Sequence, residues 1–176
     1  MITMLLRKEL EPQFDVAEQL YPEVYAALVD YTAFCDAHGD EDNAENDKLM
    51  IKLQTLTGKD LAGVNLWEWW EEDGAENLAF AISLPSPQKV TNITLSELTE
   101  LVQRAQGFTK PASTATGFQA AFYNTVVFSI RYFHQLLALN FKAYSHKLFQ
   151  RNKDSQGNYF EYSTTEIVAK LWNEKA

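Results

Sequence analysis

The sequence predicts a mainly α-helical fold in one domain over residues 1–176, arranged around one long central helix and completed by a small β element. Apolar residues recur at steps of three and four along most of the chain, which places them on one face of a helix. The length of 176 residues is near the common size of a single domain, and 46% hydrophobic residues supply a core. One short segment alternates as a β-strand does.

Residues 118–149 are the longest predicted helix and the expected centre of the fold. Their apolar positions follow steps of three and four: Phe122, Val126, Ile130, Phe133, Leu137, Phe141, Tyr144 and Leu148. Further apolar residues extend this face around the helix, which is typical of a helix that is buried on most sides. We therefore expect one long helix here, straight or bent, with the core packed around it.

The N-terminal part of the chain predicts three more helices. An apolar stripe covers residues 15–37, where Pro22 marks either a kink or a fresh first turn and Gly39 ends the helix. Asn43 is the predicted N-cap of a second helix, and a short third helix covers residues 66–73. These helices and their connections carry most of the acidic residues.

Residues 78–84 are the most strand-like segment. Large apolar and small residues alternate strictly there, and this period of two favours a strand. The small residues indicate that another element, such as a helix, packs closely on their face. A lone strand needs a partner, and residues 89–93 and 159–162 are the candidates.

Two capping boxes predict helix starts in the second half of the chain. Thr94 with Glu97 precedes one apolar stripe, and Ser163 with Glu166 precedes another. Between these two helices, residues 109–117 are rich in Thr, Ser, Ala, Pro and Gly, which predicts a loop.

Charge is segregated along the chain. Residues 1–77 carry 18 Asp and Glu against 5 Lys and Arg, whereas residues 78–176 carry 10 Lys and Arg against 6 Asp and Glu. From Glu9 to Asp47 there are 12 acids and no Lys or Arg. Unpaired buried carboxylates are costly, so we expect the acids between Asp36 and Asp47 to be mostly exposed.

The sequence carries no pattern typical of a catalytic, metal or cofactor site. It has no Gly-rich phosphate loop and no nucleophile elbow. The acidic loop that begins at Asp36 lacks the glycine and the glutamate that a calcium-binding helix–loop–helix needs at its sixth and twelfth positions. We therefore expect no cofactor, no metal and no enzymatic activity.

The expected location is cytoplasmic. The single cysteine, Cys35, excludes an intrachain disulfide and fits a reducing compartment. The first residues lack the order of a secretory signal, in which basic residues precede a long apolar run. The longest nearly uncharged stretch, between Lys110 and Lys142, contains several polar residues and favours a buried helix over a membrane span.

Three tryptophans lie close together among acids. Trp67 and Trp69 differ by roughly 200° of rotation on a helix, so one short helix cannot bury Trp67, Trp69 and Trp70 against one core. An exposed tryptophan rimmed by acids is typical of a binding hot spot. In the alternative interpretation, a second element covers Trp67 and all three tryptophans anchor the helix in the core.

These observations favour an acidic, non-enzymatic binding protein that docks on a basic protein and blocks it. Immunity proteins and inhibitors that neutralise cationic nuclease toxins work by this physics, because complementary charge speeds encounter. The basic end of the 118–149 helix lacks the density of positive charge that a nucleic-acid-binding surface has, so we expect no direct nucleic-acid binding. We also expect no membrane binding. The predicted partner-binding residues are Asp36, Asp40, Glu41, Asp42, Glu45, Asp47, Trp67, Trp70, Glu71 and Glu72.

Two other interpretations stay open. A helical enzyme or small-ligand protein would place its site in the aromatic core, lined by Phe122, Phe128, Tyr132, Phe133 and His134. A structural subunit would instead bury its acidic half against a basic neighbour. The oligomeric state does not follow from the sequence.

Overall fold

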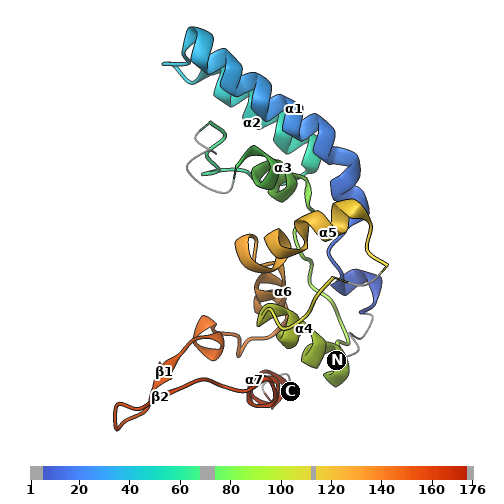
Figure 1. Ribbon diagram of the computed structural model, residues 1–176, viewed down its shortest axis with the longest axis vertical. Helices are drawn as coiled ribbons and strands as arrows, with labels where there is room; N and C mark the ends of the chain where they lie inside the picture. The colour runs from blue at the N-terminus through green and yellow to red at the C-terminus, as the bar shows by residue number, and fades with distance from the viewer. Residues whose placement is uncertain (1–5, 68–73, 112–113, 174–176) are drawn as a thin grey trace. The chain divides into compact units, whose positions relative to one another are not determined.

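The computed structural model describes residues 6–67, 74–111 and 114–173, and it confirms a mainly helical fold with a small two-stranded antiparallel sheet (Figure 1). The chain groups into two compact units. Unit 1 comprises residues 1–11, 87–116 and 123–176, and unit 2 comprises residues 12–86 and 117–122. That both units form one domain stays a prediction.

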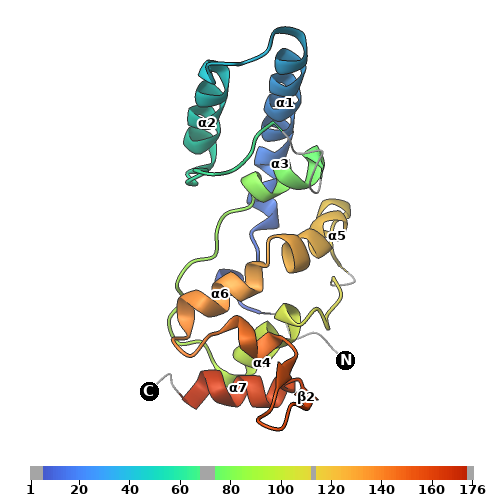
Figure 2. The same ribbon diagram turned by 90° about the vertical axis from the view of Figure 1, so that its left-hand side faces the viewer.

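Unit 2 is built on a helical hairpin. Helix α1 (Phe14–His38) and helix α2 (Ala44–Thr57) run antiparallel and are joined by the acidic loop (Figure 2). Both helices were predicted, and Pro22 lies inside α1 without ending it. Gly39 ends α1 with a φ of +71°, a conformation that L side chains rarely adopt.

The prediction of a strand at 78–84 is wrong. Residues 78–83 belong to a helix of unit 2, α3 (Ala75–Ser83). An alternation over only seven residues is also compatible with a helix. Ala75, Ala79 and Ile82 are spaced by four and three residues, so they fall on one helical face, and all three are buried. The small residue Ala79 lies in the core with residues of α1, as the expected close packing requires. The core cluster comprises Val24, Leu28, Tyr31, Leu49, Leu53, Leu61, Leu66, Ala79 and Ile82.

A half-buried lysine, Lys59, closes the end of α3. The Nζ of Lys59 donates hydrogen bonds to the carbonyl oxygens of Ala81 (2.6 Å) and Leu84 (2.9 Å). Carbonyls at a helix C-terminus lack intrahelical donors, and a cation there is favoured by the helix dipole. Burial lowers the pKa of Lys59 to about 8.

Unit 1 places α4 (Leu95–Ala105) in contact with α6 (Tyr132–Asn140) and α7 (Thr164–Asn173). Its sheet pairs β1 (Asn152–Lys153) with β2 (Tyr159–Phe160). Its remaining elements are the 3₁₀ turns η1 (Lys8–Leu10) and η4 (His146–Phe149) and the π-helical segment η3 (Thr125–Ser129). Helix α5 (Gly117–Asn124) contributes residues 117–122 to unit 2 and its last two residues to unit 1.

Both predicted capping boxes form in unit 1. The Thr94 backbone N–H donates to Glu97 (2.8 Å), and the Glu97 backbone N–H donates to the Thr94 hydroxyl (3.3 Å). Ser163 and Glu166 make the same reciprocal pair at 2.8 and 3.3 Å. Each box satisfies donors that the first turn of α4 or α7 would otherwise leave without partners.

The prediction of one long helix over 118–149 is wrong. The segment divides into α5, η3, α6 and η4, and Arg131 adopts a left-handed conformation with a φ of +55°. The Ile130 N–H bonds back to Thr125 (2.8 Å), five residues away, and the Gln135 side-chain amide donates to the Ile130 carbonyl (2.7 Å). These bonds satisfy the backbone at a break that the apolar period does not reveal.

A buried arginine joins three segments of unit 1. The Arg104 guanidinium of α4 bonds to Glu100 (2.9 Å) and to Glu11 (2.7 Å), and it lies 5.5 Å from the centre of the Phe133 ring. Arg104 is 6% exposed and Glu100 is 4% exposed. Burial works against the charged guanidinium, but the two carboxylates outweigh it and raise the Arg104 pKa.

Changing Phe133 to Ala should lower the free energy of unfolding by about 3–5 kcal/mol, because its ring is fully buried. Phe128 is a matched control, because it is 60% exposed. Its change to Ala should cost at most about 1 kcal/mol. Urea unfolding followed by circular dichroism measures both variants, and equal losses would contradict the described core.

Changing Arg104 to Met should cost about 3–5 kcal/mol, because Glu100 is left as a buried carboxylate without its cation. The double change of Arg104 to Met and Glu100 to Gln should recover part of this loss. The control is Lys110 to Met at an exposed position. A double variant that is less stable than the Arg104 variant would show that the charge on Glu100 is not what makes the change costly.

Candidate protein-docking surface

The acidic loop lies between α1 and α2 and presents most of its carboxylates to solvent. Asp36, Glu41, Asp42 and Asp47 are exposed, so the expected exposure of this loop is confirmed. Asp40 and Glu45 are half-buried. All six predicted loop residues therefore lie on one connection and on the helix ends beside it.

Asp40 has a structural role that the sequence did not indicate. Its carboxylate accepts hydrogen bonds from the backbone N–H groups of Glu45 (3.1 Å) and Asn46 (2.8 Å) and from the Tyr31 hydroxyl (3.1 Å). Asn43, the predicted cap of α2, makes no side-chain capping bond. Asp40 thus caps α2 from outside the helix and ties it to α1.

The protonation of this pair follows from these contacts. Desolvation works to raise the pKa of Asp40, but the bonds from Asn46, Glu45 and Tyr31 outweigh it and hold the pKa below its ordinary value. Burial raises the pKa of Tyr31, so its hydroxyl stays protonated and available as a donor. Asp40 is therefore a charged acceptor at neutral pH.

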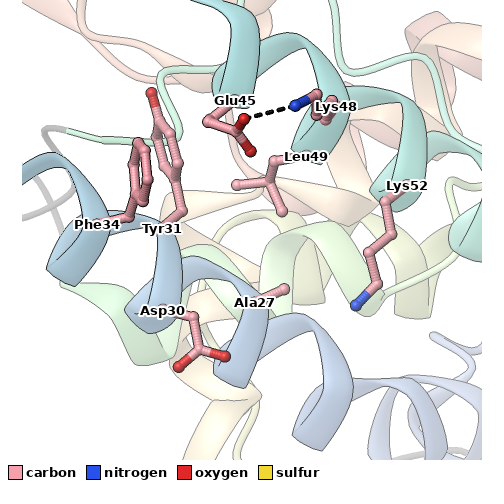
Figure 3. A pocket seen from close by; sticks show the side chains of 8 residues that line it. All are labelled: Ala27, Asp30, Tyr31, Phe34, Glu45, Lys48, Leu49 and Lys52. Carbon is pink, nitrogen blue, oxygen red and sulfur yellow. Dashed lines mark hydrogen bonds and ion pairs between the residues drawn. The ribbon is translucent and has the colours of Figure 1, made fainter. Parts of the chain in front are cut away.

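An open groove of about 320 Å³ lies beside the loop, between α1 and α2. Figure 3 shows Ala27, Asp30, Tyr31 and Phe34 projecting from α1 and Glu45, Lys48, Leu49 and Lys52 projecting from α2. Its apolar part comes from Ala27, Phe34 and Leu49. This volume is at the lower end of small-molecule sites, and it suits one large side chain of a partner.

Both lysines of the groove contact acids of the same hairpin. Lys48 pairs with Glu45, and Lys52 lies 3.4 Å from Glu23. Exposed pairs of this kind contribute little to stability, but they offset the positive charge of the lysines. The hairpin as a whole therefore remains acidic, and its groove combines an apolar part with the charged side chains of Asp30, Glu45, Lys48 and Lys52.

Exposed apolar side chains on the hairpin were missed by the sequence analysis. Phe34 and Val29 of α1 are 37% and 38% exposed, and Ile51 of α2 is 64% exposed. Phe34 belongs to the apolar stripe that predicts α1, and periodicity alone assigns it to the core. Its position within one turn of the helix end is the signal that points to exposure.

Of the predicted tryptophan anchors, the structure places Trp67, whose side chain is 40% exposed. Its backbone N–H bonds to the Asn65 side chain (3.1 Å), while the preceding residue, Leu66, is fully buried. Trp70, Glu71 and Glu72 lie outside the described residues, as does most of the helix predicted over 66–73.

The residues expected to line a site in the aromatic core belong to different units, with Phe122 in unit 2 and Tyr132, Phe133 and His134 in unit 1. Phe128 is exposed, and Phe122 stacks on Phe80 in unit 2 with a centroid distance of 4.4 Å. Tyr132 and Phe133 are buried in unit 1, where burial together with the charge of Glu11 raises the pKa of Tyr132 to about 12. A small-ligand site among these side chains stays an untested alternative.

His134 has a protein partner. Its Nδ1 lies 3.0 Å from the Tyr144 hydroxyl, and its ring makes an edge contact with Phe149. Burial and the nearby His146 lower its pKa, so the ring is neutral at pH 7. The contact with Tyr144 therefore satisfies one ring nitrogen of His134 within the protein.

Over residues 6–67, 74–111 and 114–173, no three His, Cys, Asp or Glu side chains converge as metal ligands would. Within the same ranges, no helix has both the length and the apolar character needed to cross a membrane. Searches with the sequence and the structure found no matching family model, curated protein or solved structure. The candidate surface therefore rests on its own geometry.

Changing Asp40 to Ala should destabilise the protein at pH 7 more than changing Glu41 to Ala, because Glu41 is exposed and Asp40 caps α2. A carboxylate with a lowered folded pKa stabilises above its unfolded pKa of about 3.9, and this contribution is lost as the pH falls through the folded value. Urea unfolding at pH 7 and about pH 3 measures it. If Asp40→Ala lowers the free energy of unfolding by the same amount at both pH values, Asp40 does not cap α2 as a charged carboxylate.

Proposed function

We propose that this protein is an acidic, non-enzymatic binding protein that docks on a basic protein and blocks it, as immunity proteins do with cationic toxins. The observation that carries the proposal is the exposed acidic loop beside a partly apolar groove on one helical hairpin. The formal net charge of −9 also favours attraction between this protein and a basic partner. A cytoplasmic location belongs to the same proposal.

The acids supply steering. At physiological ionic strength their field extends about 8 Å, so it orients the final approach of a basic surface and adds little to stability. Complementary charge of this kind raises association rates and disfavours acidic competitors. Asp36, Glu41, Asp42 and Asp47 are the exposed members that serve this role.

Affinity needs a desolvated anchor as well as charge. The groove lined by Phe34 and Leu49 lies beside the loop and provides an apolar surface for a partner side chain. Trp67 is a second exposed aromatic residue of unit 2. We expect Phe34 to carry more of the affinity, because it lines a concave site.

The test uses affinity capture from cells of the source organism, followed by binding kinetics on each captured protein. The loop variant combines Glu41→Gln with Asp47→Asn, and it leaves the Asp40 cap intact. Its matched control removes two other exposed carboxylates of unit 2 through Glu18→Gln and Glu76→Gln. Glu18 is about 27 Å from Asp36 along α1.

The loop variant should slow association with a basic partner by about tenfold or more at low salt, whereas the control variant should change it far less. Phe34→Ala should instead speed dissociation, because it removes contact area without changing charge. An acidic partner would contradict the proposal. So would an association rate that is indifferent to salt and to the loop changes.

A further inference from the structure

Two histidines of unit 1 meet at one tyrosine hydroxyl. The Nδ1 atom of His134, on α6, lies 3.0 Å from the hydroxyl oxygen of Tyr144, and the Nδ1 atom of His146, in η4, lies 3.2 Å from the same oxygen. The His134 ring also makes an edge contact with the Phe149 ring at a centroid distance of 4.6 Å. These contacts hold residues 144–149 against α6.

The single proton of the hydroxyl limits how this cluster can be bonded. A tyrosine hydroxyl donates one hydrogen bond, and a neutral imidazole carries one N–H and accepts a bond at its other nitrogen. Because two Nδ1 atoms meet one hydroxyl, Tyr144 donates to one ring and accepts from the other. An imidazolium can only donate. Tyr144 therefore keeps both bonds while one histidine is neutral, and its proton loses its acceptor when both histidines are charged.

The surroundings of the cluster oppose a second positive charge. Burial, the charge of His146 and the charge of Arg131 lower the pKa of His134, and the hydrogen bond of its ring to the Ala105 backbone offsets them only in part. The centres of the two histidine rings are 5.6 Å apart. Because His134 and Tyr144 are half-buried, water screens two cations at this distance less than it does at the surface.

The elements around the cluster bring no carboxylate to it. Helix α4 packs against α6, but its Glu97 pairs with Arg7 and its Glu100 pairs with Arg104. The segments η3 and α6 contain no Asp, Glu, Lys or Arg, and η4 adds another cation, Lys147. Over the residues that the structure describes, no ion pair joins either histidine to an acid.

We propose that His134, Tyr144 and His146 form a pH-sensitive latch that holds residues 144–149 on α6 at neutral pH and releases them below about pH 6, when both histidines carry a proton. Release uncovers the rings of Tyr144 and Phe149, which are half-buried in the closed latch. The latch uses no residue of the acidic loop or of the groove, so it is independent of the proposed function.

The direction of the pH effect follows from His134. Its pKa is lowered when the latch is closed, so the released and unfolded states take up the proton first as the pH falls below about 6.5. Proton uptake therefore favours release. The stabilisation that the closed latch contributes above about pH 6.5 is lost as the pH falls through the lowered pKa of His134.

Nuclear Overhauser effects between ring protons of His134 and Phe149 report the closed latch in the folded protein. They should be present at about pH 7.5 and lost at about pH 5.5. The Leu148 amide, which donates to Ser145 (3.0 Å), should exchange at least about tenfold faster at the lower pH after correction for the intrinsic rate. Amides of α1 and α4 should keep their protection, because the opening is local.

Nuclear Overhauser effects that persist unchanged at about pH 5.5 would overturn the inference. So would a loss of protection that covers α1 and α4 together with residues 144–149, because that result describes acid unfolding of the whole protein and not a local latch.

Two variants test the parts of the latch. H146N removes one titrating ring, and its amide offers both a donor and an acceptor, so Tyr144 keeps two bonds when His134 is charged. This variant should stay closed at about pH 5.5. Y144F removes the shared hydroxyl and should show the faster exchange of Leu148 at both pH values. An H146N variant that opens as the wild type does, or a Y144F variant that stays closed at about pH 7.5, would contradict the latch.

The third histidine of the chain gives the matched control. His38 is exposed at the end of α1 in unit 2, away from the latch in the sequence, and H38N removes the same kind of titrating group. This variant should open over the same pH range as the wild type. If H38N abolishes the pH dependence, the group that responds to pH is not in the latch and the inference is wrong.

Discussion

Arg104, a buried cation, constrains the packing of unit 1 through its contacts with three segments. Arg104 must keep its carboxylate partners, because an uncompensated charge in a dry interior costs several kcal/mol. Glu100 comes from the same helix, but Glu11 comes from the N-terminal segment and the Phe133 ring comes from α6. Satisfying one guanidinium therefore brings together three segments that are distant in sequence.

Local chemistry determined what could be predicted of the fold. The capping box of Thr94 and Glu97 requires only residues that are close in sequence, and it forms as predicted. The strand at 78–84 and the continuous helix at 118–149 failed because apolar spacing is ambiguous over seven residues and does not register a left-handed residue such as Arg131. That break is supported by the side chain of Gln135, which a periodic pattern does not weigh.

The candidate surface was predictable in its charge and not in its shape. Exposure of the acids follows from the lack of local cations, which is a property of composition. The groove and the exposure of Phe34 depend on how far α2 extends along α1, and this distance is a property of packing. Asp40 has two roles. It is one of the acids of the loop, and its carboxylate also holds the loop in place by accepting hydrogen bonds from the backbone at the start of α2.

Pro22 divides the backbone hydrogen-bond ladder of α1 into a shorter and a longer stretch. A proline has no N–H to donate to the carbonyl four residues before it, so the hydrogen-bond ladder of the helix is interrupted near Glu18. Residues before this point lie near the Phe14–Phe80 stack, and residues after it pair with α2. Because the buried residues Val24, Leu28 and Tyr31 all follow Pro22, we expect the backbone amides of this longer stretch to be well protected from hydrogen exchange despite the interruption.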